Sequence, residues 1–255
     1  MLRKQSFTLL LLSLLLFSFA VNVAAQDKVT VNTGVDFYNR YIWRGLDIAS
    51  TPSLQPSFSL GYSGFEFGIW GAYTMSNQTS ESDEIDFWLG YTIELENGSS
   101  IGLVATDYYF PNAGIDFFNF NSYDAFDYDP ITTDSTPDPG AHLIELGASF
   151  TGPEKFPITI SGYINVHNEA GNNTYFQVDY PVKVGDTELG LFCGAAGGAK
   201  DNPDYYGTED FAIINVGVTA NREIKVSEQL SVPLSISFIL NPNDEISYLL
   251  AGFSF

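Results

Sequence analysis

Alternating apolar and polar residues recur along most of the chain. In residues 53–62, for example, apolar or aromatic side chains at even positions alternate with serine, glutamine and glycine at odd positions. A period of two places the two sets of side chains on opposite faces of a β-strand. About twelve such runs are separated by turn-forming residues, which predicts an all-β chain without a domain boundary. The predicted strands are residues 29–43, 53–62, 65–74, 84–95, 100–110, 141–151, 156–166, 174–184, 187–196, 211–220, 226–240 and 245–255.

The connections between these runs alternate in length. Short turns at 63–64, 96–99, 152–155, 185–186 and 221–225 alternate with longer connections at 44–52, 76–83, 111–140, 167–173, 197–210 and 241–244. A soluble β-sandwich has no reason to sort loop lengths by end, whereas transmembrane barrels have short periplasmic turns and longer extracellular loops. The pattern therefore predicts a single antiparallel transmembrane β-barrel of about twelve strands. An even strand number leaves both termini in the periplasm.

The last run of the chain supports this architecture. Every second residue from Ser247 to Phe255 falls on one face, and that face ends in a bare aromatic side chain. A closing barrel strand must pair with the first strand and present apolar side chains to lipid. The ending also resembles the C-terminal signature of bacterial outer-membrane proteins. The expected partners are therefore outer-membrane lipid and the barrel-assembly machinery, which would engage the strand ending in Phe255. The alternative is the last strand of a soluble β-sandwich.

The first 25 residues have the organisation of a secretory signal peptide. Arg3 and Lys4 form a basic segment, residues 7–19 are apolar, and small residues at 23–25 precede Gln26. A retained anchor helix is the weaker alternative, because the apolar run is short for a membrane span. We expect residues 1–25 to be cleaved and residues 26–255 to form the barrel, in the outer membrane of a Gram-negative bacterium.

Four segments resemble a known family: residues 34–45 (GVDFYNRYIWRG), 52–56 (PSLQP), 65–71 (FEFGIWG) and 84–87 (EIDF). They are similar to the opening of the TorF-type porins, which overlap the uncharacterised bacterial family Gcw_chp. The resemblance is sharp over residues 34–95 and diffuse afterwards. It implies an outer-membrane barrel and gives no substrate.

Charge and cysteine content exclude other classes of protein. The chain carries 31 acidic residues against 10 lysines and arginines, a formal net charge of −21. Nucleic-acid binding requires a basic surface and is not expected. Cys193 is the single cysteine, so the chain has no internal disulfide, and its apolar strand face favours a packing role.

The predicted strand faces place charged side chains in the lumen. One interpretation is an Arg–carboxylate network that braces the barrel, in which Arg40 opposes the acids of the third and fourth strands. The other is a constriction that attracts cations, because acids outnumber bases. The two interpretations are compatible. The candidate pore-lining residues are Asp36, Arg40, Arg44, Glu66, Glu84, Asp86, Glu94, Glu145 and Asp179.

The insert at 111–140 interleaves aspartates with aromatic residues. It is predicted to fold into the mouth with acids at the entrance, to form a Ca²⁺ site, or to be a solvated acidic loop. The spacing lacks the glycine and closing glutamate of an EF-hand, which excludes that motif. Divalent cations at the acidic loops stay a possible partner. The candidate mouth-loop acids are Asp116, Asp124, Asp127, Asp129, Asp134 and Asp138.

These features predict a porin for passive diffusion of small cationic or neutral solutes, with no cofactor. The alternative is a structural or adhesion barrel with a closed lumen that acts through its acidic loops. A remote alternative is an outer-membrane lipid hydrolase, since His142 and His167 fall near loop-side strand ends and Ser149 and Asn165 are on neighbouring strands. No recognised hydrolase motif surrounds these residues, so we do not expect an enzyme.

Overall fold

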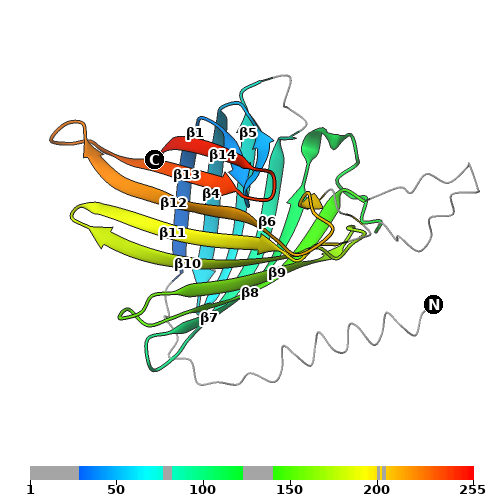
Figure 1. Cartoon of the computed structure of the whole chain (residues 1–255), viewed down its shortest axis with the longest axis horizontal. Helices are drawn as coiled ribbons and strands as arrows, with labels where there is room; N and C mark the ends of the chain where they lie inside the picture. The colour runs from blue at the N-terminus through cyan, green and yellow to red at the C-terminus, as the bar shows by residue number, and fades with distance from the viewer. Residues whose placement is uncertain (1–28, 77–81, 123–139, 200–201, 203–204) are drawn as a thin grey trace, which may run out of the picture.

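Twelve antiparallel strands form a closed barrel in the computed structural model, which describes residues 29–76, 82–122, 140–199, 202 and 205–255 (Figure 1). Each strand pairs with its neighbours in sequence, and β1 closes the barrel by pairing with both β4 and β14. This confirms the predicted fold class. The wall strands are β1 (Thr30–Tyr38), β4 (Ser53–Tyr62), β5 (Phe65–Thr74), β6 (Glu84–Glu94), β7 (Ser100–Tyr109), β8 (His142–Thr151), β9 (Thr159–His167), β10 (Thr174–Val184), β11 (Thr187–Ala196), β12 (Ala212–Lys225), β13 (Ser231–Asn241) and β14 (Ile246–Ser254).

The chain terminus contributes directly to closure. Phe37 of β1 lies opposite Phe253 of β14, and the backbones of Val35 and Phe255 exchange two hydrogen bonds of 3.0 Å. This pairing joins β1 to β14 over residues 35–39 and 251–255, where backbone donors and acceptors are satisfied within the wall. The role predicted for the last strand in closing the barrel agrees with this register.

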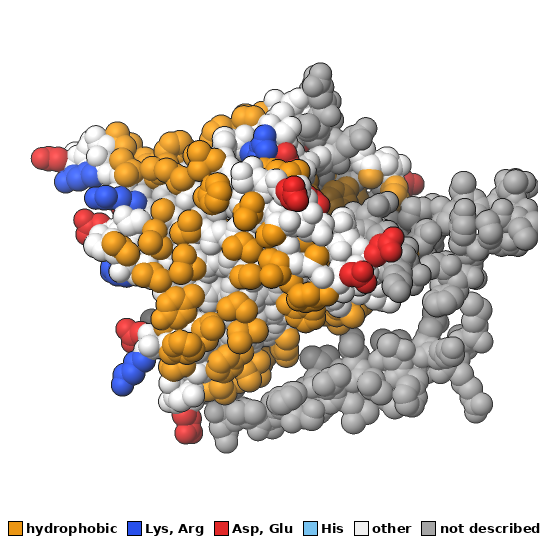
Figure 2. Space-filling view, viewed as in Figure 1, with side chains coloured by type: hydrophobic (Ala, Val, Ile, Leu, Met, Phe, Trp, Pro, Cys, Tyr) orange, Lys and Arg blue, Asp and Glu red, His pale blue; other side chains and the backbone are white. Residues whose placement is uncertain are grey.

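The two faces of the wall differ in chemistry as their alternation predicts. Leu89, Phe67 and Phe238 point outward and are about half exposed, whereas Ser53 and Gln55 point inward and are buried. Figure 2 shows apolar side chains across the strands and charged side chains gathered toward the barrel ends. An apolar outer band over a polar interior is the arrangement of a transmembrane β-barrel. In the part of the chain that the structure describes, no helix has the length and apolar character needed to cross a membrane.

The first strand is shorter than its sequence pattern predicts. β1 ends at Tyr38, and residues 41–49 form a separate hairpin of β2 (Tyr41–Trp43) and β3 (Leu46–Ala49). The hairpin reverses at Arg44 and Gly45, which both have positive φ (49° and 81°), as a tight two-residue turn requires. The connection predicted at 44–52 is therefore largely this hairpin, which we call the inner hairpin because of its position in the lumen.

Two further segments depart from their predicted places. The turn between β12 and β13 lies at 226–230 and not at 221–225, because β12 continues to Lys225. A turn of 3-10 helix, Pro111–Ala113, follows β7. Residues 114–122 then lie against outward-facing side chains of the wall, where Phe117 contacts Tyr109 (ring centroids 5.0 Å apart) and Phe87 (6.2 Å). This described part of the insert does not fold into the mouth, which was one of the three interpretations of the insert.

Candidate functional site in the lumen

The inner hairpin crosses the lumen near the barrel end that carries the longer connections. It begins and ends at the neighbouring strands β1 and β4, and its tip residue Arg44 binds Glu145 of β8, which is four strands from β4 in the wall. Along its length Tyr41 donates a hydrogen bond to Glu84 of β6 (2.7 Å), and Ser82 donates one to the carbonyl of Ile48 (2.9 Å). The hairpin is therefore anchored to the wall at its tip and along one side.

A bidentate ion pair holds the tip of the hairpin. The two terminal nitrogens of Arg44 lie 2.5 and 2.8 Å from the two carboxylate oxygens of Glu145. Tyr108 donates a hydrogen bond to the same carboxylate (2.9 Å), and the hydroxyl of Tyr206 accepts one from Arg44 (2.6 Å). The side chains of Arg44 and Glu145 are 10% and 2% exposed. Pairing and hydrogen bonding offset the cost of removing both charges from water.

Aromatic rings surround the Arg44 guanidinium. Its central carbon lies 4.4 Å from the ring centroids of Trp43 and Tyr163 and 4.5 Å from that of Tyr175. These distances are typical of cation–π contacts. Burial lowers the pKa of Arg44, but the hydrogen bond with Glu145 and the charge interactions with Glu145, Tyr206 and Tyr108 together raise it by more, so the net shift is upward and the guanidinium stays charged. The result is a cation site in the lumen that the chain fills with its own arginine.

Gly45 permits the close approach of the hairpin tip to the far wall. A Cβ atom at this position would lie 2.0 Å from the carbonyl oxygen of Ile214 in β12. Asn241 of β13 donates a hydrogen bond to the carbonyl of Gly45 (3.3 Å), and both Ile214 and Asn241 are fully buried. Glycine is therefore required here both for its positive φ and for its lack of a side chain.

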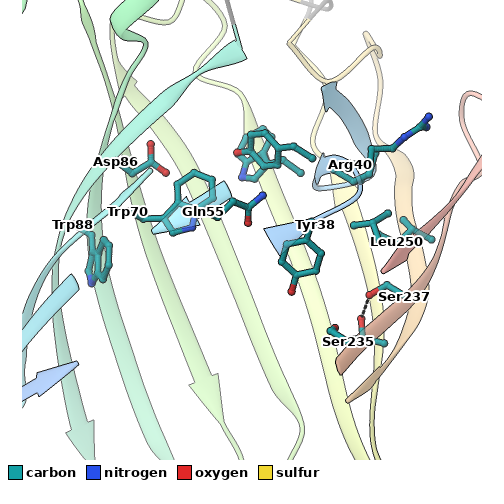
Figure 3. A pocket seen from close by; sticks show the side chains of 14 residues that line it. Tyr38, Arg40, Gln55, Trp70, Asp86, Trp88, Ser235, Ser237 and Leu250 are labelled. Atoms are coloured by element: carbon teal, nitrogen blue, oxygen red, sulfur yellow. Dashed lines mark hydrogen bonds between the residues drawn. The ribbon is translucent and has the colours of Figure 1, made fainter. Parts of the chain in front are cut away.

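A cavity of about 550 Å³ lies in the lumen beside the inner hairpin (Figure 3). Side chains from opposite sides of the barrel line it, and they combine aromatic rings with amide, hydroxyl and carboxylate groups. Among them are Tyr38, Gln55, Trp70, Asp86, Trp88 and Ser237. Arg40 also lines the cavity, but its guanidinium extends away from it in Figure 3 and pairs with Asp47 at 3.2 Å. A lining of this kind suits a small solute with both polar and apolar surface.

The structure brings some of the predicted pore-lining residues together. Glu84 and Asp86 lie two residues apart on the inward face of β6, and Arg44 pairs with Glu145. The expected opposition between Arg40 and the acids of β5 and β6 is wrong, because the carboxylate that Arg40 pairs with in the described residues is Asp47.

The remaining predicted acids are spread along the lumen wall. Asp36 faces inward in register with Gln55, and Asp179 accepts a hydrogen bond from Gln177 (2.8 Å). Glu66 accepts one from the indole of Trp88 (3.3 Å), and Glu94 is exposed at the end with the short turns. These four carboxylates do not form one ring.

The predicted mouth-loop acids are only partly within the described structure. Asp116 belongs to the segment that lies on the outer face, and the structure does not describe the segment that holds the others, Asp124, Asp127, Asp129, Asp134 and Asp138. No three His, Cys, Asp or Glu side chains within the described ranges are placed to hold a metal ion together.

His142, one of the two histidines considered for hydrolysis, has other partners. Nδ1 of His142 lies 2.9 Å from the Asp107 carboxylate, and Nε2 lies 2.5 Å from the carbonyl oxygen of Phe117. Phe120 stacks on the ring at 4.3 Å. Both ring nitrogens of His142 contact acceptors in this arrangement and neither contacts a serine hydroxyl, so it serves to dock the segment after β7 on the wall.

The fold and lumen define a transmembrane β-barrel that carries a hairpin inside it. Residues 22–232 match the sequence model of the family described as a bacterial protein of unknown function (Gcw_chp). The chain belongs to this family, as the segments in residues 34–95 indicate. No curated protein matches the chain.

Two solved structures of outer-membrane proteins are similar to the chain. One is an outer membrane channel from Pseudomonas putida F1, with 13% sequence identity, a TM-score of 0.43, and coverage of 92% of this chain and 95% of that one. The other is OprB from Pseudomonas putida at high pH, with 11% identity, a TM-score of 0.35, and coverage of 80% and 58%.

Proposed function

We propose that this protein is an outer-membrane channel for passive diffusion of small cationic or neutral solutes, and that the inner hairpin forms its constriction. The observation that carries the proposal is the cavity of about 550 Å³ in the polar lumen of a closed barrel. A packed soluble core would not leave a cavity of this size among polar side chains. A membrane location accords with the apolar outward band and with the export signal expected at residues 1–25.

The charges around the constriction favour cations. Glu84, Asp86 and Glu145 face the lumen near the inner hairpin, and Arg44 is neutralised by Glu145. The other two acids, Glu84 and Asp86, make the electrostatic potential of the lumen negative beside the inner hairpin. Carboxylates at a constriction raise the local concentration of cations and repel anions. Neutral solutes would be limited mainly by size.

A structural barrel with a closed lumen is the second candidate. The observation that favours it is the anchoring of the inner hairpin, since Arg44 is bound on the far side of the lumen while Tyr41 is bound to β6. A hairpin held at both places resists displacement. In this reading the barrel would act through its external loops and conduct nothing.

Planar-bilayer recording of the refolded protein separates the two candidates. The variant for comparison is Arg44→Ala with Glu145→Ala, which removes the tip anchor without leaving an unpaired buried charge. We expect small cation-selective conductance from the wild type and a larger conductance from the double variant. A correctly folded barrel that conducts in neither form would overturn the channel and favour the structural role.

A further inference from the structure

Two indoles flank a carboxylate on one side of the lumen cavity. Trp70 of β5 lies directly opposite Asp86 of β6, and Trp88 follows two residues later on the same inward face. The Trp88 ring lies against Gly68, where a Cβ atom would be 1.9 Å from the indole. Figure 3 shows Trp70, Asp86 and Trp88 together on the side of the cavity away from Arg40. We call these three side chains the Asp86 site.

The carboxylate of this site has no basic partner within the described residues. Asp86 takes part in none of their salt bridges, and its Oδ1 is buried there without a hydrogen-bond partner. The base that lines the same cavity, Arg40, is bound to Asp47 at 3.2 Å. Glu84 adds a second carboxylate on the same face of β6. The carboxyl groups of Glu84 and Asp86 contact each other, so a bound cation would stabilise their charged forms and compensate the buried Oδ1 of Asp86.

The lumen already contains one site with this chemistry. Around Arg44, the Glu145 carboxylate binds the guanidinium edge, and the rings of Trp43 and Tyr163 cover its faces at 4.4 Å. The Asp86 site offers the same combination of carboxylate and aromatic faces without a cation of the chain's own. The two sites therefore share the same types of side chain, and they differ because Arg44 of the chain itself occupies one of them.

We propose that the Asp86 site binds an organic cation that carries an ammonium or guanidinium group on a compact apolar body. The charged group lies against Asp86, and the apolar part lies against Trp70 and Trp88, which attract it through cation–π and apolar contact. This ligand class rests on the proposed function, in which solutes enter the lumen. The cavity of about 550 Å³ is large enough for such a solute.

Isothermal titration calorimetry on the full barrel in detergent tests the proposal without requiring conductance. The probes are choline, its neutral isostere 3,3-dimethylbutan-1-ol, and glucose as a neutral polyol. We expect choline to bind at least about tenfold more tightly than the isostere, because only choline carries the charge. Asp86→Asn should weaken choline binding by about tenfold or more, and Asp86→Glu should restore most of it.

A matched control separates the site from general electrostatics. Glu188→Gln removes an inward carboxylate of β11 that does not line the cavity, and it should leave choline affinity unchanged. Equal affinity for choline and its isostere, preference for glucose, or unchanged binding by folded Asp86→Asn would each overturn the proposal. Because binding is measured in detergent, a barrel that binds choline but does not conduct would refute the channel and leave the site standing.

Discussion

At the scale of single residues, Gly45 and Gly98 have the same backbone conformation in different surroundings. Both have φ of 81°, but a Cβ at Gly98 would meet nothing within 4 Å, whereas one at Gly45 would lie 2.0 Å from the Ile214 carbonyl. We expect Gly98→Ala to cost about 1–2 kcal/mol for its left-handed backbone, and Gly45→Ala to cost more, because the hairpin tip must also move. Urea unfolding of both variants measures the difference, and equal losses would contradict the docking of the tip.

The inward or outward direction of a side chain could be predicted at this scale, but its partner could not. The period of two correctly places Glu84, Asp86 and Glu145 inside. No local signal indicates that Glu145 binds Arg44, because 101 residues separate them in sequence and the contact depends on a hairpin that crosses the lumen. The hydroxyl of Tyr206, from a loop after β11, was missed for the same reason.

At the scale of elements, β6 provides a direct test of the two faces. Leu89 lies near the middle of this strand, points outward and is 55% exposed, whereas Thr92 points inward. Leu89→Arg places a charge in lipid and should cost about 2–4 kcal/mol near mid-bilayer. Thr92→Arg should cost much less, since its side chain reaches water in the lumen. Equal losses on urea unfolding would show that the assigned faces are wrong.

The inner hairpin is the element that the pattern could not place. Residues 40–43 continue the alternation of β1, so periodicity extends the wall strand to Trp43. Whether an alternating segment joins the wall or folds inward depends on partners across the lumen, such as Glu84 for Tyr41. The local signal that was available is the Arg44-Gly45 pair, which suits a tight hairpin turn. At β12 the opposite error occurred, because the polar residues 221–225 look like a turn but continue the strand.

At the scale of the whole molecule, strand order and loop asymmetry assign a side of the membrane to each end. The longer connections, such as the one at 197–210, are predicted to lie outside the cell, and Glu209 is an exposed residue in this connection between β11 and β12. In a Cys193→Ser background, Glu209→Cys should react with an impermeant thiol reagent on intact cells. Asp186→Cys, in the short turn between β10 and β11, should react only after lysis. The reverse labelling pattern would show that the barrel has the opposite orientation in the membrane.

The constraints on a closed barrel explain why its architecture could be predicted from the sequence. A closed barrel requires every strand to alternate, every neighbour to pair and the last strand to meet the first. These constraints repeat along the chain, so small errors at strand ends did not change the strand number or the pairing of β1 with β14. The side chains and the inner hairpin in the lumen are under no such repeated constraint. Their arrangement depends on individual contacts, which the sequence pattern does not predict.

The lumen charges lead to a prediction about the conducting barrel. The triple variant Glu66→Gln, Glu84→Gln and Asp86→Asn removes three inward carboxylates from β5 and β6. Its reversal potential in a KCl gradient should move from cation-selective toward neutral, because carboxylates at a constriction set the sign of the permeant ion. The shift should be larger at low salt, where screening is weak.

Single variants assign this effect to a residue. Glu84→Gln also weakens the anchor at Tyr41, so it should raise conductance together with its change in selectivity. Asp86→Asn leaves the hydrogen bonds of the inner hairpin intact and should change selectivity at nearly constant conductance. If the barrel conducts but its reversal potential is the same in the triple variant, the cation filter cannot lie on β5 and β6. The acids of the insert at 111–140 would then be the next candidates, because this insert is rich in aspartates.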